Sequence, residues 1–207
     1  MLTKKRIPLL IAFIFCFEAV IYLWAVWTAS LDRSNFFSIT EEFIFDKCAR
    51  NSGRVSSAII LVTLLMVGYY GLKNIYRDDK KKDAFRILIT LFAINHLVHF
   101  FYVYQNFKHH AMVLSIVENL HGFITFICII ILPFILWSVK NLNRVLYFGI
   151  ILHLFNVCYF INKTFLGKVK PDHPAYHNQF GIVVITAACL YVLYRVFREN
   201  KRISPAN

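Results

Sequence analysis

Six long apolar stretches constrain most strongly how this chain can fold. Each is long enough to cross a lipid bilayer as an α-helix, which takes about 20 mainly apolar residues. The stretches cover residues 7–29, 56–75, 84–107, 112–139, 145–165 and 180–197. Inside a bilayer the backbone finds no water to bond with, so each span must satisfy its own N–H and C=O groups. The sequence therefore predicts an all-α fold, a polytopic bundle of six transmembrane helices forming a single membrane domain over residues 1–207.

The composition agrees with a membrane protein and argues against a nucleic-acid-binding protein. Hydrophobic residues make up 58% of the chain, more than an ordinary soluble domain contains. The formal net charge is +12, but lysine and arginine occur in short clusters between the apolar stretches. They do not form a basic stripe interleaved with aromatic residues on a polar segment. We therefore expect the lipid bilayer as the main partner, and no nucleic acid.

The distribution of basic residues predicts the orientation of the helices. With six crossings, both termini and the two loops near residues 80 and 142 lie on one side of the membrane. That side holds 15 lysine and arginine residues, and the opposite side holds 8. An excess of these residues marks the cytoplasmic side. The first stretch is also longer than the core of a signal peptide. The sequence thus predicts a multi-pass protein of the cell membrane, with an uncleaved first span and both termini inside.

The longest loop on the other side of the membrane precedes the second stretch. It contains a capping-box pattern, Ser38-Ile39-Thr40-Glu41, followed by the apolar residues 43–45. We expect a short helix there that lies on the outer membrane surface.

Ionisable side chains near the middle of the apolar stretches are the strongest functional signal. A charged side chain at the bilayer centre costs at least about 2.5–3.5 kcal/mol, so such residues persist where they face protein or water. Six fall at similar depths: Glu18, His96, His99, Glu118, His121 and His153. Helical periodicity places them on polar faces of the first, third, fourth and fifth stretches. The sequence predicts a polar interior shared by these four helices, with the second and sixth stretches only structural.

The spacing of these residues is typical of metal ligands. His96 and His99 are three positions apart, as are Glu118 and His121, so each pair shares a helical face. Glu-x-x-His is the ligand spacing of di-iron carboxylate bundles, but this chain offers only Glu18 and Glu118 as carboxylates. A site rich in histidine favours zinc, copper or iron(II). We predict a transition metal, zinc or iron, with these ligands: His96, His99, His121 and His153. Glu118 or Glu18 would act as a further ligand or as the general base.

A second group of histidines lies near the ends of the helices on the outer side. His109 and His110 end the third stretch, and His173 and His177 precede the sixth. They could form an outer metal site or the mouth of an entry path. Solvated loop histidines are the alternative interpretation.

Three functions are compatible with these patterns. The favoured one is an intramembrane metal-dependent enzyme, a hydrolase or oxidoreductase acting on a lipid or another apolar small molecule. An open coordination position would activate water or dioxygen. The second is a b-type haem protein that transfers electrons, with axial histidines on facing helices. The third is a proton-coupled carrier of a metal or small solute, although transporters commonly contain internal repeats, which this sequence lacks.

Overall fold

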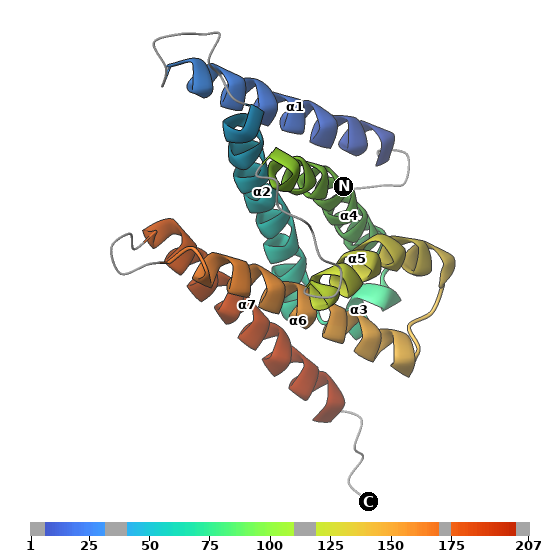
Figure 1. Ribbon diagram of the computed structural model, residues 1–207. Coiled ribbons are helices and arrows are strands. Elements are labelled where there is room, and N and C mark those ends of the chain that lie inside the picture. Colours follow the sequence, from blue (N-terminus) through green and yellow to red (C-terminus); the bar gives the residue numbers. More distant parts are fainter. Residues whose placement is uncertain (1–6, 32–40, 110–118, 170–174, 202–207) are drawn as a thin grey trace, which may run out of the picture.

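Seven helices make up the part of the chain that the computed structural model describes, residues 7–31, 41–109, 119–169 and 175–201. They are α1 (Ile7–Leu31), α2 (Glu41–Tyr70), α3 (Leu72–Arg77), α4 (Asp79–His109), α5 (Leu120–Ser138), α6 (Arg144–Leu166) and α7 (Tyr176–Lys201) (Figure 1). All but the short α3 are long and apolar enough to cross a membrane. The predictions of an all-α fold and of six long apolar helices are confirmed.

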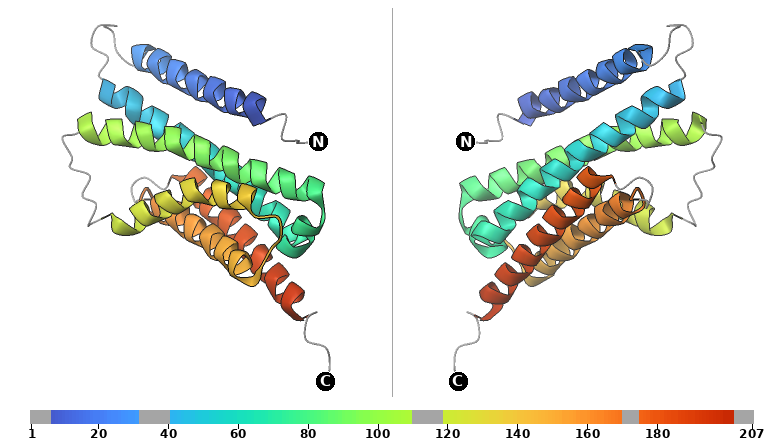
Figure 2. Two further views of the ribbon diagram at one scale, coloured as in Figure 1. Left: turned by 90° about the vertical axis from the view of Figure 1, so that its right-hand side faces the viewer. Right: turned by 90° about the vertical axis from the view of Figure 1, so that its left-hand side faces the viewer.

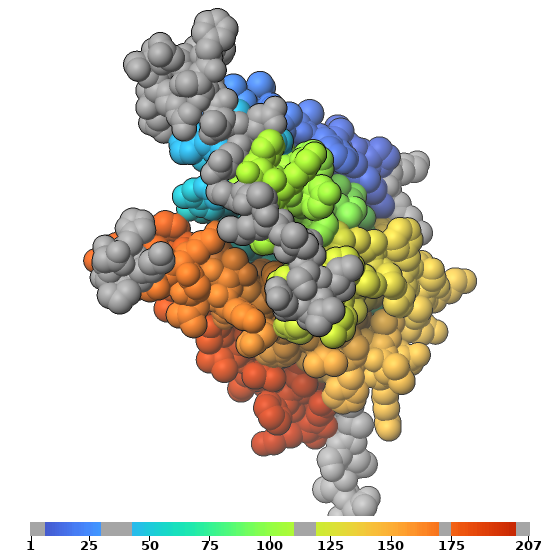
Figure 3. Space-filling model, in the orientation of Figure 1, coloured from blue at the N-terminus to red at the C-terminus, as the bar shows by residue number. Residues whose placement is uncertain are grey.

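The helices α2 and α4 form the centre of the bundle. They pack against each other more extensively than any other pair among the described residues, and α1 lies against both. On the other side, α5 packs against α4, α6 lies between α5 and α7, and α7 returns to α2. Figure 2 shows α1 at one edge and α6 and α7 at the other, with α2 and α4 between them. The space-filling view in Figure 3 shows the same arrangement, with α1 toward one edge of the described helices and α7 toward the other.

The buried apolar side chains form two clusters along the bundle. The larger one joins α2 to α7 and contains Ile60, Phe92 and Ile150. The smaller one joins α1, the beginning of α2 and the end of α4, and contains Ala25 and Cys48. On both α2 and α4, the buried residues between the two clusters are polar: Ser52 and Ser56 on α2, and Asn95 on α4. The fold therefore places a polar layer between two apolar regions, inside the bundle.

Large apolar side chains also cover the outside of the bundle. Leu9 and Phe134 are 70% exposed, and Leu152 is 72% exposed. Each of the six long helices carries such residues on the face that it does not bury against its neighbours. Helices that are apolar on both their inner and outer faces are expected where the surroundings are lipid rather than water. This outer surface is consistent with contact to a lipid bilayer, as the sequence predicts.

The second long helix begins at Glu41, 15 residues before the apolar stretch predicted at residues 56–75. The apolar residues 43–45, which we expected in a surface helix, belong to the first turns of α2. The reason is a buried position at every fourth residue, beginning with Ile44 and Cys48. Asp46 and Arg50 lie on the opposite face of the helix, where they form an ion pair. Residues 38–40 of the capping-box pattern lie outside the described part of the chain.

A glycine ends α2 before the predicted position. Gly71 has a φ of 78°, in the left-handed region that L side chains rarely adopt. A Cβ there would also collide with the carboxylate of Glu199 on α7. The chain turns at this point into α3 and then into α4, whose first turn is capped by the Asp78 side chain.

Basic residues bring the ends of several helices together at one end of the bundle. Lys73 Nζ donates a hydrogen bond to Asn200 Oδ1 at 3.2 Å. The guanidinium of Arg195 donates to the Tyr70 carbonyl oxygen at 2.7 Å. These residues belong to the side to which the charge distribution assigned both termini. That this end faces the cytoplasm stays a prediction.

Candidate intramembrane polar site

The carboxyl group of Glu18 lies in the middle of the buried face of α1. That face consists of Ile14, Glu18, Ile21, Ala25 and Ala29, which are three or four residues apart, as helical packing requires. Only 2% of the Glu18 surface is exposed. Its Oε1 accepts a hydrogen bond of 2.7 Å from the Ser52 hydroxyl on α2, whereas its Oε2 is buried without a partner among the described residues.

On α2, the surface near the Glu18 carboxyl group consists of small side chains. Cys48, Ser52 and Ser56 are four residues apart and buried, so they form one stripe along the helix. Their short side chains allow α1 and α4 to approach closely. Gly53 likewise leaves room for α4, because a Cβ there would lie 3.0 Å from Cε1 of His99. The His99 ring therefore lies directly against the α2 backbone.

Asn95 on α4 connects the two serines. It is fully buried, and its Nδ2 donates hydrogen bonds to the Ser52 carbonyl oxygen at 3.1 Å and to Ser56 Oγ at 2.9 Å. Ser56 Oγ also lies 3.4 Å from Nδ1 of His96. One set of hydrogen bonds therefore joins Glu18 on α1, through α2 and Asn95, to the first histidine of α4.

The two histidines of α4 lie beside each other at the end of this set. Their ring centroids are 5.2 Å apart, and the His96 ring also stacks on Phe92. His99 Nδ1 is buried without a hydrogen-bond partner in the described structure, as is Asn95 Oδ1. An unpaired buried polar atom costs about 1–3 kcal/mol. Glu18, Asn95 and His99 each keep one such atom in this layer of the described structure.

An apolar groove of about 540 Å³ lies next to this polar layer, between α1 and α4. Its lining includes Phe15 from α1 and Leu97 and Tyr102 from α4. The Tyr102 hydroxyl donates a hydrogen bond of 3.4 Å to the backbone oxygen of Glu18. The same tyrosine thus contacts both the polar layer and the groove, where an apolar molecule could lie.

The other two predicted histidine ligands have different surroundings. His121 on α5 is exposed, and its Nε2 lies 2.7 Å from Oδ1 of Asn156 on α6. Asn156 in turn donates to Thr125 Oγ1 at 2.7 Å. His153 on α6 is buried and lines an apolar groove between α5 and α6. Of the four histidines, the structure brings His96 and His99 together.

No group of three or more histidine, cysteine, aspartate or glutamate side chains is arranged to hold a metal ion within the described residues. Glu118 lies outside the described part of the chain. A metal centre at the predicted residues therefore stays a prediction, and only His96 and His99 stand together as a pair.

The predicted outer histidine site is described only in part. The His109 ring stacks on Phe45 of α2, with centroids 5.5 Å apart. His177 is exposed in the first turn of α7. His110 and His173 lie outside the described residues, so the predicted outer site stays untested.

Sequence reasoning missed the contribution of α2 to this site. It treated the second apolar stretch as structural, but Ser52, Gly53 and Ser56 form the surface against which Asn95 and His99 pack. The signal in the sequence was the spacing of four residues between Cys48, Ser52 and Ser56. Ser52 and Gly53 also lie before the predicted start of that stretch.

Comparisons with protein-family models, with curated proteins and with solved structures found no match for this chain.

Proposed function

We propose that this chain is a multi-pass membrane protein that binds and releases protons at Glu18 and His99, as a proton-coupled carrier of a small solute or metal. The observation that carries the proposal is the hydrogen-bonded layer that joins Glu18 to His96, beside His99. Ionisable residues that persist inside a membrane commonly form proton relays in pumps and carriers.

The roles of the residues in this layer follow from their chemistry. A carboxyl and an imidazole can each gain and lose a proton, so Glu18 and His99 are the proton-binding groups. The amide of Asn95 does not release a proton at ordinary pH. We therefore assign Asn95, together with Ser52 and Ser56, to positioning the carboxyl and the two rings.

Proton movement into vesicles tests this function. The purified chain is reconstituted into liposomes that contain a pH-sensitive dye, and a membrane potential is imposed. The assay is run alone and then with divalent metal ions and small organic solutes. We expect faster acidification than in empty vesicles, and at least a tenfold loss of the excess rate in Glu18→Gln. Asp46→Asn, the same change on the outer face of α2, should retain the rate. An equal rate in Glu18→Gln would contradict the proposal.

A metal-dependent enzyme that acts on an apolar molecule is the second candidate function. It is supported by the adjacent His96 and His99 rings, by the unpaired His99 Nδ1 and by the apolar groove next to them. A further protein ligand would have to come from outside the described residues, where Glu118 lies. Elemental analysis and an absorbance spectrum of the same preparation separate the candidates. A stoichiometric zinc or iron that is lost in His99→Gln would favour the enzyme, and a Soret band would establish haem.

A further inference from the structure

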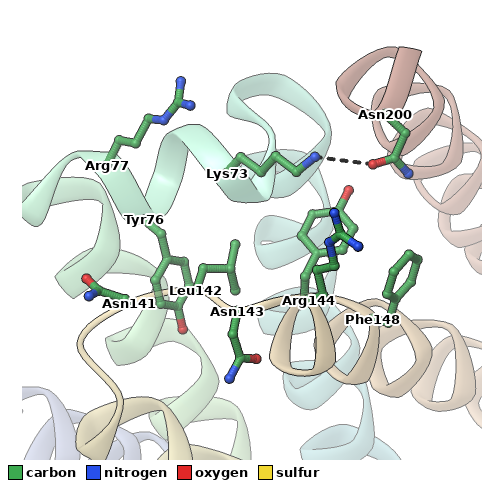
Figure 4. Close-up of a pocket in the computed structure, with 10 residues that line it drawn as sticks. Lys73, Tyr76, Arg77, Asn141, Leu142, Asn143, Arg144, Phe148 and Asn200 are labelled. Carbon is green, nitrogen blue, oxygen red and sulfur yellow. Dashed lines mark hydrogen bonds between the residues drawn. The ribbon is translucent and has the colours of Figure 1, made fainter. Parts of the chain in front are cut away.

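A cavity of about 570 Å³ lies at the end of the bundle where α3, α6 and α7 meet (Figure 4). It lies beyond the beginning of α4 at Asp79, which is 16 positions from Asn95, where the polar layer begins on that helix. Its walls come from α3, from the loop between α5 and α6, from the first turns of α6 and from the last turn of α7. All of these segments are helix ends or loops, so the cavity lies at the depth of lipid headgroups if the long helices cross the membrane.

The charged residues that line this cavity are all basic. They are Lys73 and Arg77 on α3 and Arg144 on α6, and none of the described lining residues is acidic. In Figure 4 the Lys73 side chain points toward Asn200, whereas the Arg77 side chain runs in a different direction, so we take Lys73 and Arg144 as the charged centre and Arg77 as the rim. The nearest carboxylate that bonds to a lining residue is that of Glu199, which accepts a hydrogen bond from the Tyr147 hydroxyl at 3.1 Å. The basic residues outnumber this single carboxylate.

None of these cations forms an ion pair within the described structure, although the Lys73 amine also lies over the Tyr147 ring, 5.3 Å from its centroid. The same amine bonds to the neutral side chain of Asn200 and to the Glu199 carbonyl oxygen. A basic group without an acidic partner retains its attraction for an external anion. The cavity is therefore complementary to a negatively charged group.

The beginning of α6 adds a second source of positive potential. Asn143 is the N-cap, and it accepts the N–H of Leu146 with its side chain and the N–H of Tyr147 with its carbonyl oxygen. Arg144 and Val145 are the first two residues of the helix, and their N–H groups are not the ones that bond to Asn143. A helix N-terminus carries a partial positive charge and favours phosphate and carboxylate groups.

An apolar groove of about 430 Å³ begins beside the basic cavity and follows α5 and α6 into the bundle. Asn143 lines both the cavity and the groove, so the two meet at the beginning of α6. Beyond Asn143 the groove is lined by apolar residues and glycine, including Leu146 and Gly149, as far as His153. A free phosphate compound would use only the cavity, whereas an amphipathic molecule would use both.

We propose that this end of the bundle binds an anionic phospholipid, with its phosphate in the basic cavity and one acyl chain in the groove between α5 and α6. Basic pockets between membrane helices on the cytoplasmic side bind anionic headgroups in this way. The end in question carries the larger share of basic residues, as expected for the side that faces an anionic leaflet. The site is separate from the proposed proton-binding layer and does not depend on it.

Lipid binding to the full-length purified chain tests the proposal. Phosphatidylglycerol and phosphatidylcholine with identical acyl chains compete for the chain in detergent, and bound lipid is counted by native mass spectrometry. We expect roughly a 25-fold preference for phosphatidylglycerol, because the two central basic residues, Lys73 and Arg144, each contribute about a factor of five toward an anionic headgroup. Glycerol 3-phosphate is the soluble probe, and it should compete far more weakly than the lipid. Equal binding of the two lipids would overturn the proposal without any variant.

Two sets of variants then test the two parts of the site. Lys73→Gln with Arg144→Gln should abolish the preference, while Lys80→Gln with Lys140→Gln removes the same charge from the same end without touching the cavity and should retain it. Gly149→Phe fills the groove and should weaken binding of both lipids but not of glycerol 3-phosphate. Unchanged preference in the cavity variant, unchanged lipid binding in Gly149→Phe, or soluble phosphate that competes as well as the lipid would each overturn the proposal. Elution as a single species establishes that each variant is folded.

Discussion

At the scale of single residues, Gly53 determines how closely the His99 ring can approach α2. No side chain separates the ring from the helix, since a Cβ at Gly53 would lie 3.0 Å from Cε1 of His99. Gly149 on α6 is a matched contrast, because a Cβ there would meet no atom within 4 Å. Both glycines are inside helices, where alanine is favoured over glycine by about 1 kcal/mol.

We expect Gly149→Ala to raise the thermal stability of the protein and Gly53→Ala not to raise it. The helical preference for alanine acts at both positions, but at Gly53 the added methyl must displace the His99 ring, which costs about 1–3 kcal/mol. Thermal unfolding in detergent, followed by circular dichroism, measures both variants against the wild type. Equal stabilisation by the two substitutions would show that the His99 ring does not pack on Gly53.

The sequence could identify Glu18, His96 and His99 as candidates because ionisable side chains inside apolar stretches are costly and therefore informative. It could not identify Ser52, Gly53 and Ser56 in the same way. Small residues are common wherever helices pack closely in membranes, so their presence has many explanations. Their role became clear only from the contacts with Glu18, Asn95 and His99.

At the scale of whole helices, composition predicted which segments are helical, and capping decided where they begin. The stretch predicted at residues 84–107 became α4, Asp79–His109. The extra residues are charged and fall outside an apolar pattern, but the Asp78 side chain accepts the N–H groups of Lys80 and Lys81 at 2.9 and 3.2 Å. An N-cap of this kind satisfies N–H groups that the helix itself leaves unpaired.

The cap at Asp78 should make stability depend on pH. The hydrogen bond from the Lys81 side chain, followed by backbone hydrogen bonds, holds the pKa of the Asp78 carboxyl below its usual value. A lowered pKa stabilises the folded chain above the ordinary aspartate pKa of about 3.9, and the stabilisation is lost as the pH falls through the lower folded value. Asn at this position caps a helix without titrating.

We therefore expect the wild type to lose more thermal stability than Asp78→Asn when the pH is lowered from 6 to about 3, below the ordinary pKa of aspartate. Asp78→Ala, which removes the cap, should be less stable than both at pH 6. Melting temperatures of the three proteins across this range provide the measurement. The same acid-induced loss in the wild type and in Asp78→Asn would contradict a role for the ionised Asp78 cap.

At the scale of the whole molecule, the fold separates two apolar clusters by a polar layer that spans α1, α2 and α4. The sequence predicted a polar interior but assigned it to the helices that carry the ionisable residues. Periodicity shows which face of a helix is polar, and it does not show which helix lies opposite. The chain places α2 opposite both Glu18 and Asn95, while His121 bonds to Asn156 across α5 and α6.

The central claim is that Glu18 and His99 act in one proton-handling site, and the most direct test compares single and double variants. The rate of vesicle acidification is measured for the wild type, Glu18→Gln, His99→Gln and the double variant, at equal protein content. If the two residues serve one route, the double variant should lose no more than the more impaired single variant. Losses that multiply in the double variant, or single variants with the wild-type rate, would contradict the claim.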